Sequence, residues 1–348
     1  MHKNIKIIFN DNIEFEKLWN NFLEKYEHTF TQTLIYQEYL YSYINNLENK
    51  SFILLQNNIQ VAIVPLFLEK LNSSNSFSIS NSYIPIGVFS NKKIEKIAFE
   101  YIHNLALELN ITQIKIVLNN GKTSYNILKK YNFFETNNLN LTIDLTSSEE
   151  KLWSNLSKSF KSLINQYTKN TTHTLNIMNK NNYSWEIFKE FYNFHKYIAK
   201  QNARDIKLFE KQYEFVKNGY ATLMFIKQDN TYIHFSLFFH YNKHVTYASS
   251  VAIKLSNDTP LSHFVLWNAN LYFKQKAYKS IEYSSPSGFY KHSGIDDYQN
   301  TKGNSIASFK RNMGAIPNTQ YRGIKFYDKT LLKNYLDEYY NNYTIDEK

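Results

Sequence analysis

Two adjacent cations near the end of the chain are the first candidates for chemistry. Lys310 and Arg311 lie in the segment SIASFKRNMGA (305–315), between Phe309 and Met313. Only three arginines occur among the 40 Lys and Arg residues. Arginine can hold a phosphate with two hydrogen bonds, whereas lysine acts as a point charge. The pair therefore predicts either a charged rim around an anionic substrate or two surface cations whose stems cover an apolar face.

A predicted helix N-terminus offers a second place for an anion. Thr259 can cap a helix that has Pro260 in its first turn, and Ser262 and His263 follow in the same turn. Free backbone N–H groups and the helix dipole favour negative charge at such a position. The plainer interpretation is that Thr259 is only a helix cap.

Lysines on another predicted helix could extend a basic surface. Within residues 147–170, Lys158, Lys161 and Lys169 lie away from the apolar stripe. They could form a basic track for tRNA or for a nucleotide-linked substrate. The alternative is that they form the ordinary solvated face of a helix.

Several kinds of chemistry are excluded or lack support. The chain has no cysteine, which excludes thiol catalysis, disulfides and cysteine-based metal sites. His240 and His244 lie on a predicted strand–turn–strand segment, so they lack the helical spacing of a zinc site, and no metal is expected. Glycine-rich loops of the type that bind nucleotides for hydrolysis or redox chemistry are missing from the sequence.

Composition predicts a folded protein of two domains. The chain has 348 residues, 43% of them hydrophobic, and a net charge of +10. The charge serves solubility, or it matches an anionic partner such as a nucleotide-linked substrate, tRNA or a membrane surface. The N-terminus lacks the apolar core of a signal peptide, and no apolar run is long enough to span a bilayer. We expect a cytoplasmic protein without a transmembrane segment. Its basic surface could still contact a membrane peripherally.

Both halves of the chain show the same order of elements: a strand meander, a long helix, a strand, a short helix and a strand. In the first half the helical patterns cover 13–25, 91–109 and 125–133, and the strand patterns cover 5–9, 51–70, 111–118 and 139–145. The pattern over 51–70 predicts two strands joined as a hairpin at Asn57-Asn58. The second half has helical patterns at 147–170, 184–200, 208–217, 259–277 and 329–340, a short helix within 305–315, and strand patterns at 220–227, 232–241, 244–253, 280–285 and 321–327.

This order predicts an α+β fold built from two units, residues 1–146 and 147–348. Each unit should contain a mixed, mostly antiparallel sheet flanked by helices. The relationship between the units is architectural, because the two halves show no residue-level repeat.

Such a tandem arrangement resembles two GNAT acyltransferase units, as in the Fem-type aminoacyltransferases that build peptidoglycan bridges and their FemAB-like relatives. Three segments carry the resemblance, which covers most of residues 147–315 and, more loosely, the whole chain. They are SSEEKLWSNLSKSFKSLINQYTKN (147–170), NDTPLSHFVLWNANLYFKQKAYKSIEYSS (257–285) and SIASFKRNMGA, which is similar to the family's closing Phe-Lys-x-x-Phe-Gly segment.

The chain also departs from that family's pattern. Met313 stands where an aromatic residue usually precedes Gly314. The helical-hairpin arm of the larger Fem enzymes is missing, so the shorter relatives that use a nucleotide-linked cell-wall precursor fit better. The segment 253–262 contains no glycine where CoA-dependent members have a glycine-rich pyrophosphate loop. This disfavours CoA as the donor.

The resemblance implies roles for particular residues. Acyl transfer to an amine needs donors for a tetrahedral oxyanion, a proton acceptor and contacts for an anionic donor. Lys310 would stabilise the developing charge and Arg311 would hold a phosphate. Tyr283 could donate to the oxyanion, with Ser284 beside it at the edge where a GNAT sheet splays. Asp297 could accept the amine proton, although a solvated turn is the plainer interpretation.

The sequence as a whole predicts an acyl- or aminoacyltransferase acting on an amine of a cell-envelope glycan or of its nucleotide-linked precursor. The second unit would be catalytic on the donor side, and the first would be a degenerate unit on the acceptor side. No cofactor would be bound permanently, because the acyl donor would arrive as aminoacyl-tRNA, acyl carrier or acyl-CoA. The alternatives are a CoA- or carrier-protein-dependent N-acyltransferase of an amino sugar and a non-enzymatic basic module that binds RNA or another polyanion.

Overall fold

Local sequence signals set several of the observed elements. This computed structural model describes residues 4–71, 74–118, 125–170, 173–200, 204–253, 260–284 and 302–343. Asn57 and Asn58 both have positive φ and close a tight hairpin. Asparagine tolerates that left-handed conformation better than most residues, which confirms the predicted turn. Asn91 caps the long helix of the first half by accepting from the N–H groups of Lys93 and Ile94.

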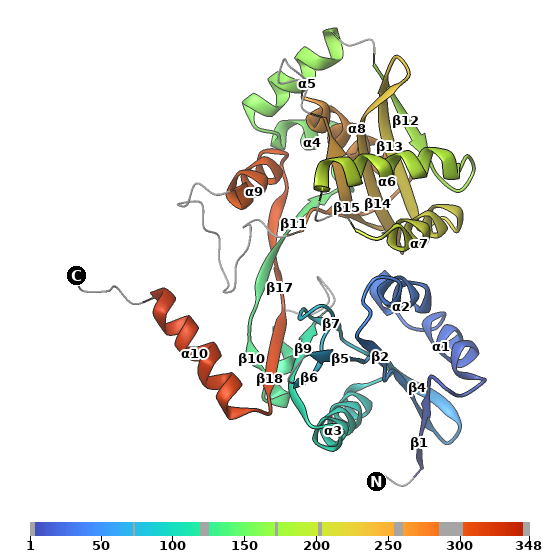
Figure 1. The fold of residues 1–348 in the computed structure, drawn as a ribbon, viewed down its shortest axis with the longest axis vertical. Coiled ribbons are helices and arrows are strands. Elements are labelled where there is room, and N and C mark those ends of the chain that lie inside the picture. The colour runs from blue at the N-terminus through green and yellow to red at the C-terminus, as the bar shows by residue number, and fades with distance from the viewer. Residues whose placement is uncertain are drawn as a thin grey trace. The chain divides into compact units, whose positions relative to one another are not determined.

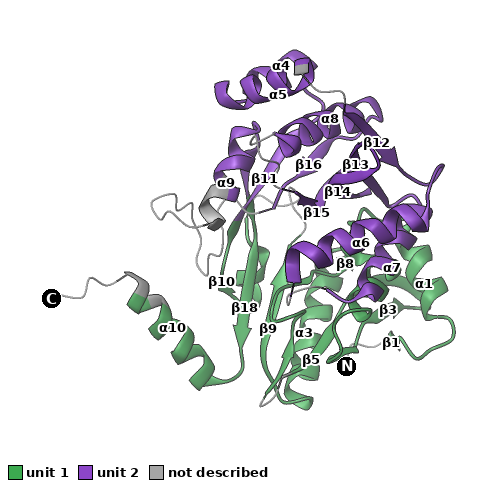
Figure 2. Ribbon diagram, turned by 45° about the horizontal axis from the view of Figure 1, so that its top comes forward, with its two compact units in different colours: residues 1–138, 291–293, 319–348 green, residues 139–290, 294–318 purple. Residues whose placement is uncertain are grey.

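Unit 1 contains residues 1–138 and 319–348 (Figure 2). Its helices are α1 (Phe15–Leu23), α2 (Leu34–Tyr41), α3 (Lys92–Glu108) and α10 (Lys329–Tyr343), with 3-10 turns η1 (Phe30–Gln32) and η2 (Ile127–Tyr131). Its strands are β1 (Ile5–Phe9), β2 (Leu47–Asn49), β3 (Phe52–Gln56), β4 (Ile59–Val64), β5 (Phe67–Leu71), β6 (Ser74–Phe77), β7 (Ile84–Pro85), β8 (Val88–Phe89), β9 (Ile111–Val117), β10 (Phe134–Glu135) and β18 (Arg322–Phe326).

Two sheets organise the described part of unit 1. A smaller one has the order β1-β3-β4-β8, and a larger one has the order β10-β18-β9-β6-β5-β2, with β7 also paired to β9. Buried residues of α1, including Trp19, pack on the smaller sheet. In the larger sheet β6 and β9 are parallel, as expected for strands joined through the long helix α3.

Unit 2 contains residues 139–290 and 294–318. Its sheet has the order β12-β13-β14-β15-β16-β11-β17 in the described residues, and Figure 1 shows helices on both of its faces. The strands are β11 (Asn138–Asp144), β12 (Thr174–Met178), β13 (Ala221–Gln228), β14 (Thr231–Tyr241), β15 (His244–Ala252), β16 (Ser280–Glu282) and β17 (Ile316–Gln320). The helices are α4 (Glu149–Asn155), α5 (Lys158–Asn170), α6 (Trp185–Ala199), α7 (Ile206–Lys217), α8 (Leu261–Gln275) and α9 (Lys302–Asn312).

The long strands of unit 2 place different side chains on its two faces. On β14, Phe238 packs against Phe273 of α8, whereas Phe235 packs against Phe191 of α6. Successive side chains of a strand point to opposite faces, so one strand serves both helical layers. The parallel neighbours β15 and β16 are connected through α8, just as β6 and β9 are connected through α3. The mixed, mostly antiparallel α+β architecture predicted for both halves is therefore confirmed.

The observed units differ in two respects from the predicted division at residue 146. The chain enters unit 2 at residue 139, and residues 319–348 belong to unit 1 rather than to unit 2. The physical reason is strand pairing: β18 lies between β9 and β10, and its buried Ile324 pairs with Lys115. A short strand pattern does not reveal which sheet it joins.

The single helix predicted over 147–170 is also corrected by the structure. Leu156 is extended with ψ 143° and ends α4, after which α5 begins. The Ser157 hydroxyl accepts from the N–H of Phe160, which satisfies one of the free donors at the start of the second helix. Ser157 therefore restarts the helix, and this changes the direction of the segment that carries Lys158 and Lys161.

Candidate functional site

The three segments that carried the sequence resemblance come together within unit 2. The imidazole of His263 on α8 lies 4.4 Å from the ring of Phe160 on α5 and 4.9 Å from the ring of Phe309 on α9, centroid to centroid. The two phenylalanine rings lie 5.4 Å apart. These three side chains form an aromatic cluster, and Lys310 follows Phe309 directly in the sequence.

His263 occupies an unusual environment inside this cluster. Its Nδ1 atom is buried and has no hydrogen-bond partner. Burial lowers the pKa of the imidazole to about 4, so the ring is neutral at pH 7. A neutral, partly buried imidazole with a free ring nitrogen is able to accept or donate one further hydrogen bond.

Lys310, which follows Phe309 in α9, is partly buried. Among the described residues it has neither an ion pair nor a hydrogen bond, and desolvation lowers the pKa of its ammonium group. Removing an unpaired cation from water is unfavourable, so such a group is a candidate for contact with an anion. Arg311, the next residue, is also partly buried and already has an interaction partner.

The position of these two cations also has a simple structural explanation. Both lie in the last turn of α9, where positive charge interacts favourably with the helix dipole. Met313 is buried in the core of unit 2, and Gly314 ends the helix with φ +84°. Phe309 and Met313, four residues apart, thus pack against the core of unit 2. Gly314 then turns the chain three residues after Arg311.

Basic residues lie close in sequence to the hydrogen bond that joins α5 to α9 in unit 2. The N–H of Ser157 donates to the carbonyl of Asn312 at 3.0 Å, which joins the start of α5 to the end of α9. Lys158 and Arg311 each lie next to one partner of this bond. Lys161, one turn further along α5, donates to the carbonyl of Ser154 at 3.0 Å. We call Lys158, Lys161, Lys310 and Arg311 the basic corner.

The parallel strand pair of unit 2 opens close to its start. Strands β15 and β16 pair only through residues 244–246 and 280–282. From Tyr247 to Ala252, β15 has no neighbour on that side among the described residues. Tyr247 opposes Phe238 and Ser249 opposes Leu237, which leaves Ala248 as an extra residue in a bulge. Bulges are frequent beside active sites because they redirect backbone and side-chain groups.

In unit 1 the corresponding position is occupied. Beyond the parallel pairing of β6 with β9, residues Ile84 and Pro85 of β7 pair with Ile116 and Val117 of β9. A strand therefore fills the space that stays open next to β15 among the described residues. Within the described residues, the two sheets therefore differ at this position.

A buried polar network joins β14 to β15. The Nε2 atom of His234 lies 2.9 Å from the hydroxyl of Ser236, which in turn donates to Ser250 at 3.1 Å. Nδ1 of His234 is buried without a partner, and burial lowers the pKa of this histidine to about 3. Tyr247, Ala248 and the rest of this region were not among the residues predicted from the sequence. Its available signal was the run of small residues ASS inside a β-branched strand.

The remaining predicted site residues are distributed as follows. Tyr283 is fully buried, and its hydroxyl donates to Oδ1 of Asn270 on α8 at 2.9 Å, so it already has a partner within the protein. Ser284 follows it with φ +67°, and its carbonyl accepts from the N–H of Leu141. Ser262 is partly buried in the first turn of α8, and Thr259 and Asp297 lie outside the described residues.

A groove of about 450 Å³ lies elsewhere on unit 2, lined by residues of α4, α5 and α8. Trp153 and Trp267 form part of its wall, with ring centroids 5.0 Å apart, and Glu149 and Glu150 belong to its lining. Two carboxylates disfavour an anionic ligand, so the groove does not suit the donor that the basic corner could hold.

Within the described residues no His, Asp and Glu side chains gather into a group that could hold a metal ion.

Solved structures, but no known sequence family, resemble this chain. Neither a protein-family model nor a curated protein matches the sequence. Among solved structures, FemX superposes with a TM-score of 0.70 at 11% identity, covering 94% of this chain and 99% of FemX. This chain has the tandem GNAT-like fold of FemX.

Two further structures share this architecture. L-PGS from Bacillus licheniformis has a TM-score of 0.59 at 10% identity, covering 92% of this chain and 94% of its own. A tandem GNAT protein from the clavulanic acid biosynthesis pathway has a TM-score of 0.52 at 8% identity, covering 92% and 98%. The resemblance found in the sequence is thereby confirmed at the level of the fold.

No described helix combines the length and apolar character needed to cross a membrane.

The depressed pKa of His263 leads to a prediction about stability. The unfolded chain protonates this histidine near pH 6.5, but the folded chain does so only near pH 4. Between these values the unfolded state binds more protons, so stability falls as the pH drops through this window. The effect is at most about 1.4 kcal/mol per pH unit for one such group, and partial exposure reduces it.

Replacing His263→Phe keeps an aromatic ring in the cluster and removes the titrating group. Urea unfolding at pH 7 and pH 5 should show a smaller loss of stability in this variant than in the wild type. His244→Phe removes an exposed histidine whose Nδ1 lies 2.8 Å from the hydroxyl of Ser280, and it is the control. Its loss of stability between pH 7 and pH 5 should stay closer to that of the wild type than the loss of His263→Phe. Equal losses in wild type and His263→Phe would contradict the assignment of a neutral His263.

Proposed function

We propose that the chain is an acyl- or aminoacyltransferase whose catalytic unit is unit 2. The observation that carries the proposal is Lys310, a partly buried cation without a partner among the described residues. It lies on the helix whose Phe309 contacts His263, in a fold shared with FemX. The transferred group would move to an amine of a cell-envelope glycan or of its nucleotide-linked precursor.

The reaction assigns separate tasks to the residues of the site. Attack of an amine on the donor carbonyl produces a negative oxygen, which a fixed cation such as Lys310 stabilises more in the transition state than in the ground state. Collapse of the tetrahedral intermediate then breaks the bond between the carbonyl carbon and the oxygen or sulfur of the donor, and the proton that the attacking amine loses passes through water to that leaving atom. Neutral His263, whose Nδ1 is buried, would hold its place in the aromatic cluster beside the site. The basic corner would hold the anionic part of the donor, and unit 1 would provide the acceptor side.

The open edge of β15 supports the choice of unit 2 over unit 1. Backbone groups of residues 247–252 lack a strand partner on one side within the described part of the chain. Unpaired backbone groups at a sheet edge can bind an extended ligand. We propose that the carbonyl of the donor lies at this edge, as the resemblance to GNAT enzymes implies.

The identity of the donor can be tested through its charge. We expect aminoacyl-tRNA or an acylated carrier protein to bind better than acetyl-CoA, because residues 253–262 contain no glycine to surround a pyrophosphate. Calorimetry measures both. Low-micromolar binding of acetyl-CoA would promote the alternative of a CoA-dependent N-acyltransferase of an amino sugar.

Salt dependence then tests the basic corner itself. Affinity for tRNA should fall steeply between 50 and 200 mM salt through counterion release, and Lys158→Ala should reduce the slope of log K against log salt by about one. Lys169→Ala, on the exposed face of α5, is the matched control. If the affinity of the wild type for tRNA does not change with salt concentration, the positive net charge of the chain serves solubility only.

A further inference from the structure

Unit 1 holds two cations that neither the sequence analysis nor the proposed reaction uses. Lys115 lies on β9 and Arg322 on the neighbouring strand β18. The register pairs Arg322 with Val117 and Ile324 with Lys115. Lys115 and Arg322 are therefore diagonal neighbours on one face of the sheet, with Cα atoms about 7–8 Å apart. Both side chains are partly buried.

Lys115 is held in place by a chain of hydrogen bonds. Its ammonium group donates to the backbone carbonyl of Asn81 at 2.8 Å and to the Asn81 side chain. The N–H of Asn81 donates to Oε2 of the buried Glu69 at 2.8 Å, and the hydroxyl of Ser78 donates to the same oxygen. The lysine therefore has a fixed position before any ligand arrives.

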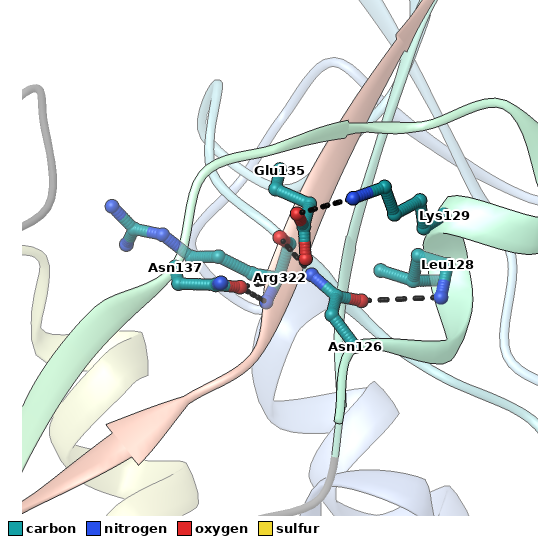
Figure 3. Close-up of polar contacts among 6 residues, drawn as sticks. All are labelled: Asn126, Leu128, Lys129, Glu135, Asn137 and Arg322. Carbon is teal, nitrogen blue, oxygen red and sulfur yellow. Dashed lines mark hydrogen bonds and ion pairs between the residues drawn. The ribbon is translucent and has the colours of Figure 1, made fainter.

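Arg322 is fixed equally well but keeps donors free. Its Nε donates to the carbonyl of Thr136, and its guanidinium lies over the ring of Tyr83, 4.6 Å from the centroid. The hydroxyl of Tyr83 is itself bonded to Thr136 at 2.8 Å. Figure 3 shows the guanidinium pointing away from the side chains of Asn126, Lys129 and Glu135. The terminal nitrogens of Arg322 have no partner within the described part of the chain.

The charges of this cluster do not balance. Glu69 supplies one negative charge against two positive charges, and it already accepts two hydrogen bonds. The pKa of Lys115 is lowered to about 8, mainly by burial; Glu69 acts against this effect, and the nearby Arg322 adds to it. Two partly buried like charges are unfavourable unless a third, opposite charge joins them.

We propose that Lys115 and Arg322 form a binding site for an oxyanion, a phosphate or a carboxylate, on unit 1. The free edge of the Arg322 guanidinium matches the two oxygens of such a group, and Lys115 supplies a second charge from the neighbouring strand. This site rests on contacts within unit 1 alone and does not depend on the proposed reaction. A bound anion would raise the pKa of Lys115, because it favours the charged form.

The scarcity of arginine gives this site a direct test. With ¹⁵N-labelled arginine, the Nε–Hε spectrum of the whole chain contains one signal for each of Arg204, Arg311 and Arg322, and Arg322→Lys identifies the third by its loss. Titrations with inorganic phosphate, pyrophosphate and N-acetyl-dialanine should move the Arg322 signal to saturation. Tighter binding of pyrophosphate indicates a phosphate ligand, and tighter binding of the peptide indicates a carboxylate.

Variants separate this site from general electrostatic attraction. Lys115→Met should weaken binding at least 10-fold. Lys325→Met is the matched control, because Lys325 is a partly buried lysine on the same strand as Arg322 but on the opposite face, and it should bind as the wild type does. The proposal fails if no probe moves the Arg322 signal, if Lys115→Met binds normally, or if both lysine variants lose the same affinity.

Discussion

Replacing Lys310 with alanine should lower the turnover of acyl transfer by roughly 100-fold, which corresponds to about 2.7 kcal/mol of transition-state stabilisation. The reason is that Lys310 is a partly buried cation with no partner in the described structure, and it follows Phe309, which contacts His263. Because no described interaction is lost, the melting temperature should stay within a few degrees. Product formation by mass spectrometry and thermal unfolding measure the two quantities.

The shape and the protonation of the cation provide further readouts. Lys310→Arg keeps the charge but replaces a point charge by a planar group, so it should restore only part of the activity. Since desolvation lowers the pKa of Lys310, turnover that needs the cation should decline as the pH rises through that lowered value, below the usual 10.5. Lys169→Ala on the exposed face of α5 is the control and should change neither turnover nor stability. Near-normal turnover of Lys310→Ala, or a loss explained entirely by unfolding, would remove Lys310 from the active site.

Gly314→Ala should destabilise unit 2 by about 2 kcal/mol or more. Gly314 has φ +84°, and a left-handed conformation costs a residue with a side chain about 1–2 kcal/mol. An added Cβ would also lie 3.0 Å from Cβ of Asn155 and 3.2 Å from its backbone. Backbone cannot move aside as easily as the end of a side chain, so overpacking adds to the strain. Urea unfolding of both proteins measures the difference.

Gly219→Ala is the matched control for this change. Gly219 also has positive φ, +76°, but its added Cβ would approach only the flexible side chain of Lys180, at 3.0 Å. This variant should therefore show the backbone cost without the contact cost. If Gly314→Ala is no more destabilising than Gly219→Ala, the packing of Gly314 against Asn155 does not fix the end of α9.

Local patterns in the sequence predicted the elements correctly where the cause is local. Asn57-Asn58 sets a tight hairpin because asparagine tolerates positive φ, and Asn91 starts α3 because its side chain accepts the first free N–H groups. The repeated order of strands and helices was also enough to predict tandem units of the type that FemX has. These features depend on neighbours within a few residues or on the order of elements.

Long-range pairing decided the rest. Nothing near residues 322–326 indicates that this strand returns to unit 1, because its place is determined by pairing with β9 and β10. The same pairing brings Arg322 next to Lys115. Likewise, only the structure shows that β7 fills the edge of β9 while the edge of β15 has no described neighbour.

For the candidate site, the sequence by itself determined which residue types were available, and it identified Lys310, Arg311 and His263 as candidates. The tertiary structure decided their environments: it surrounds His263 with Phe160 and Phe309, buries Tyr283 against Asn270, and leaves Lys310 partly buried without a described partner. Solvation and partner atoms determine what a charged or polar group can do, and both come from segments distant in the sequence.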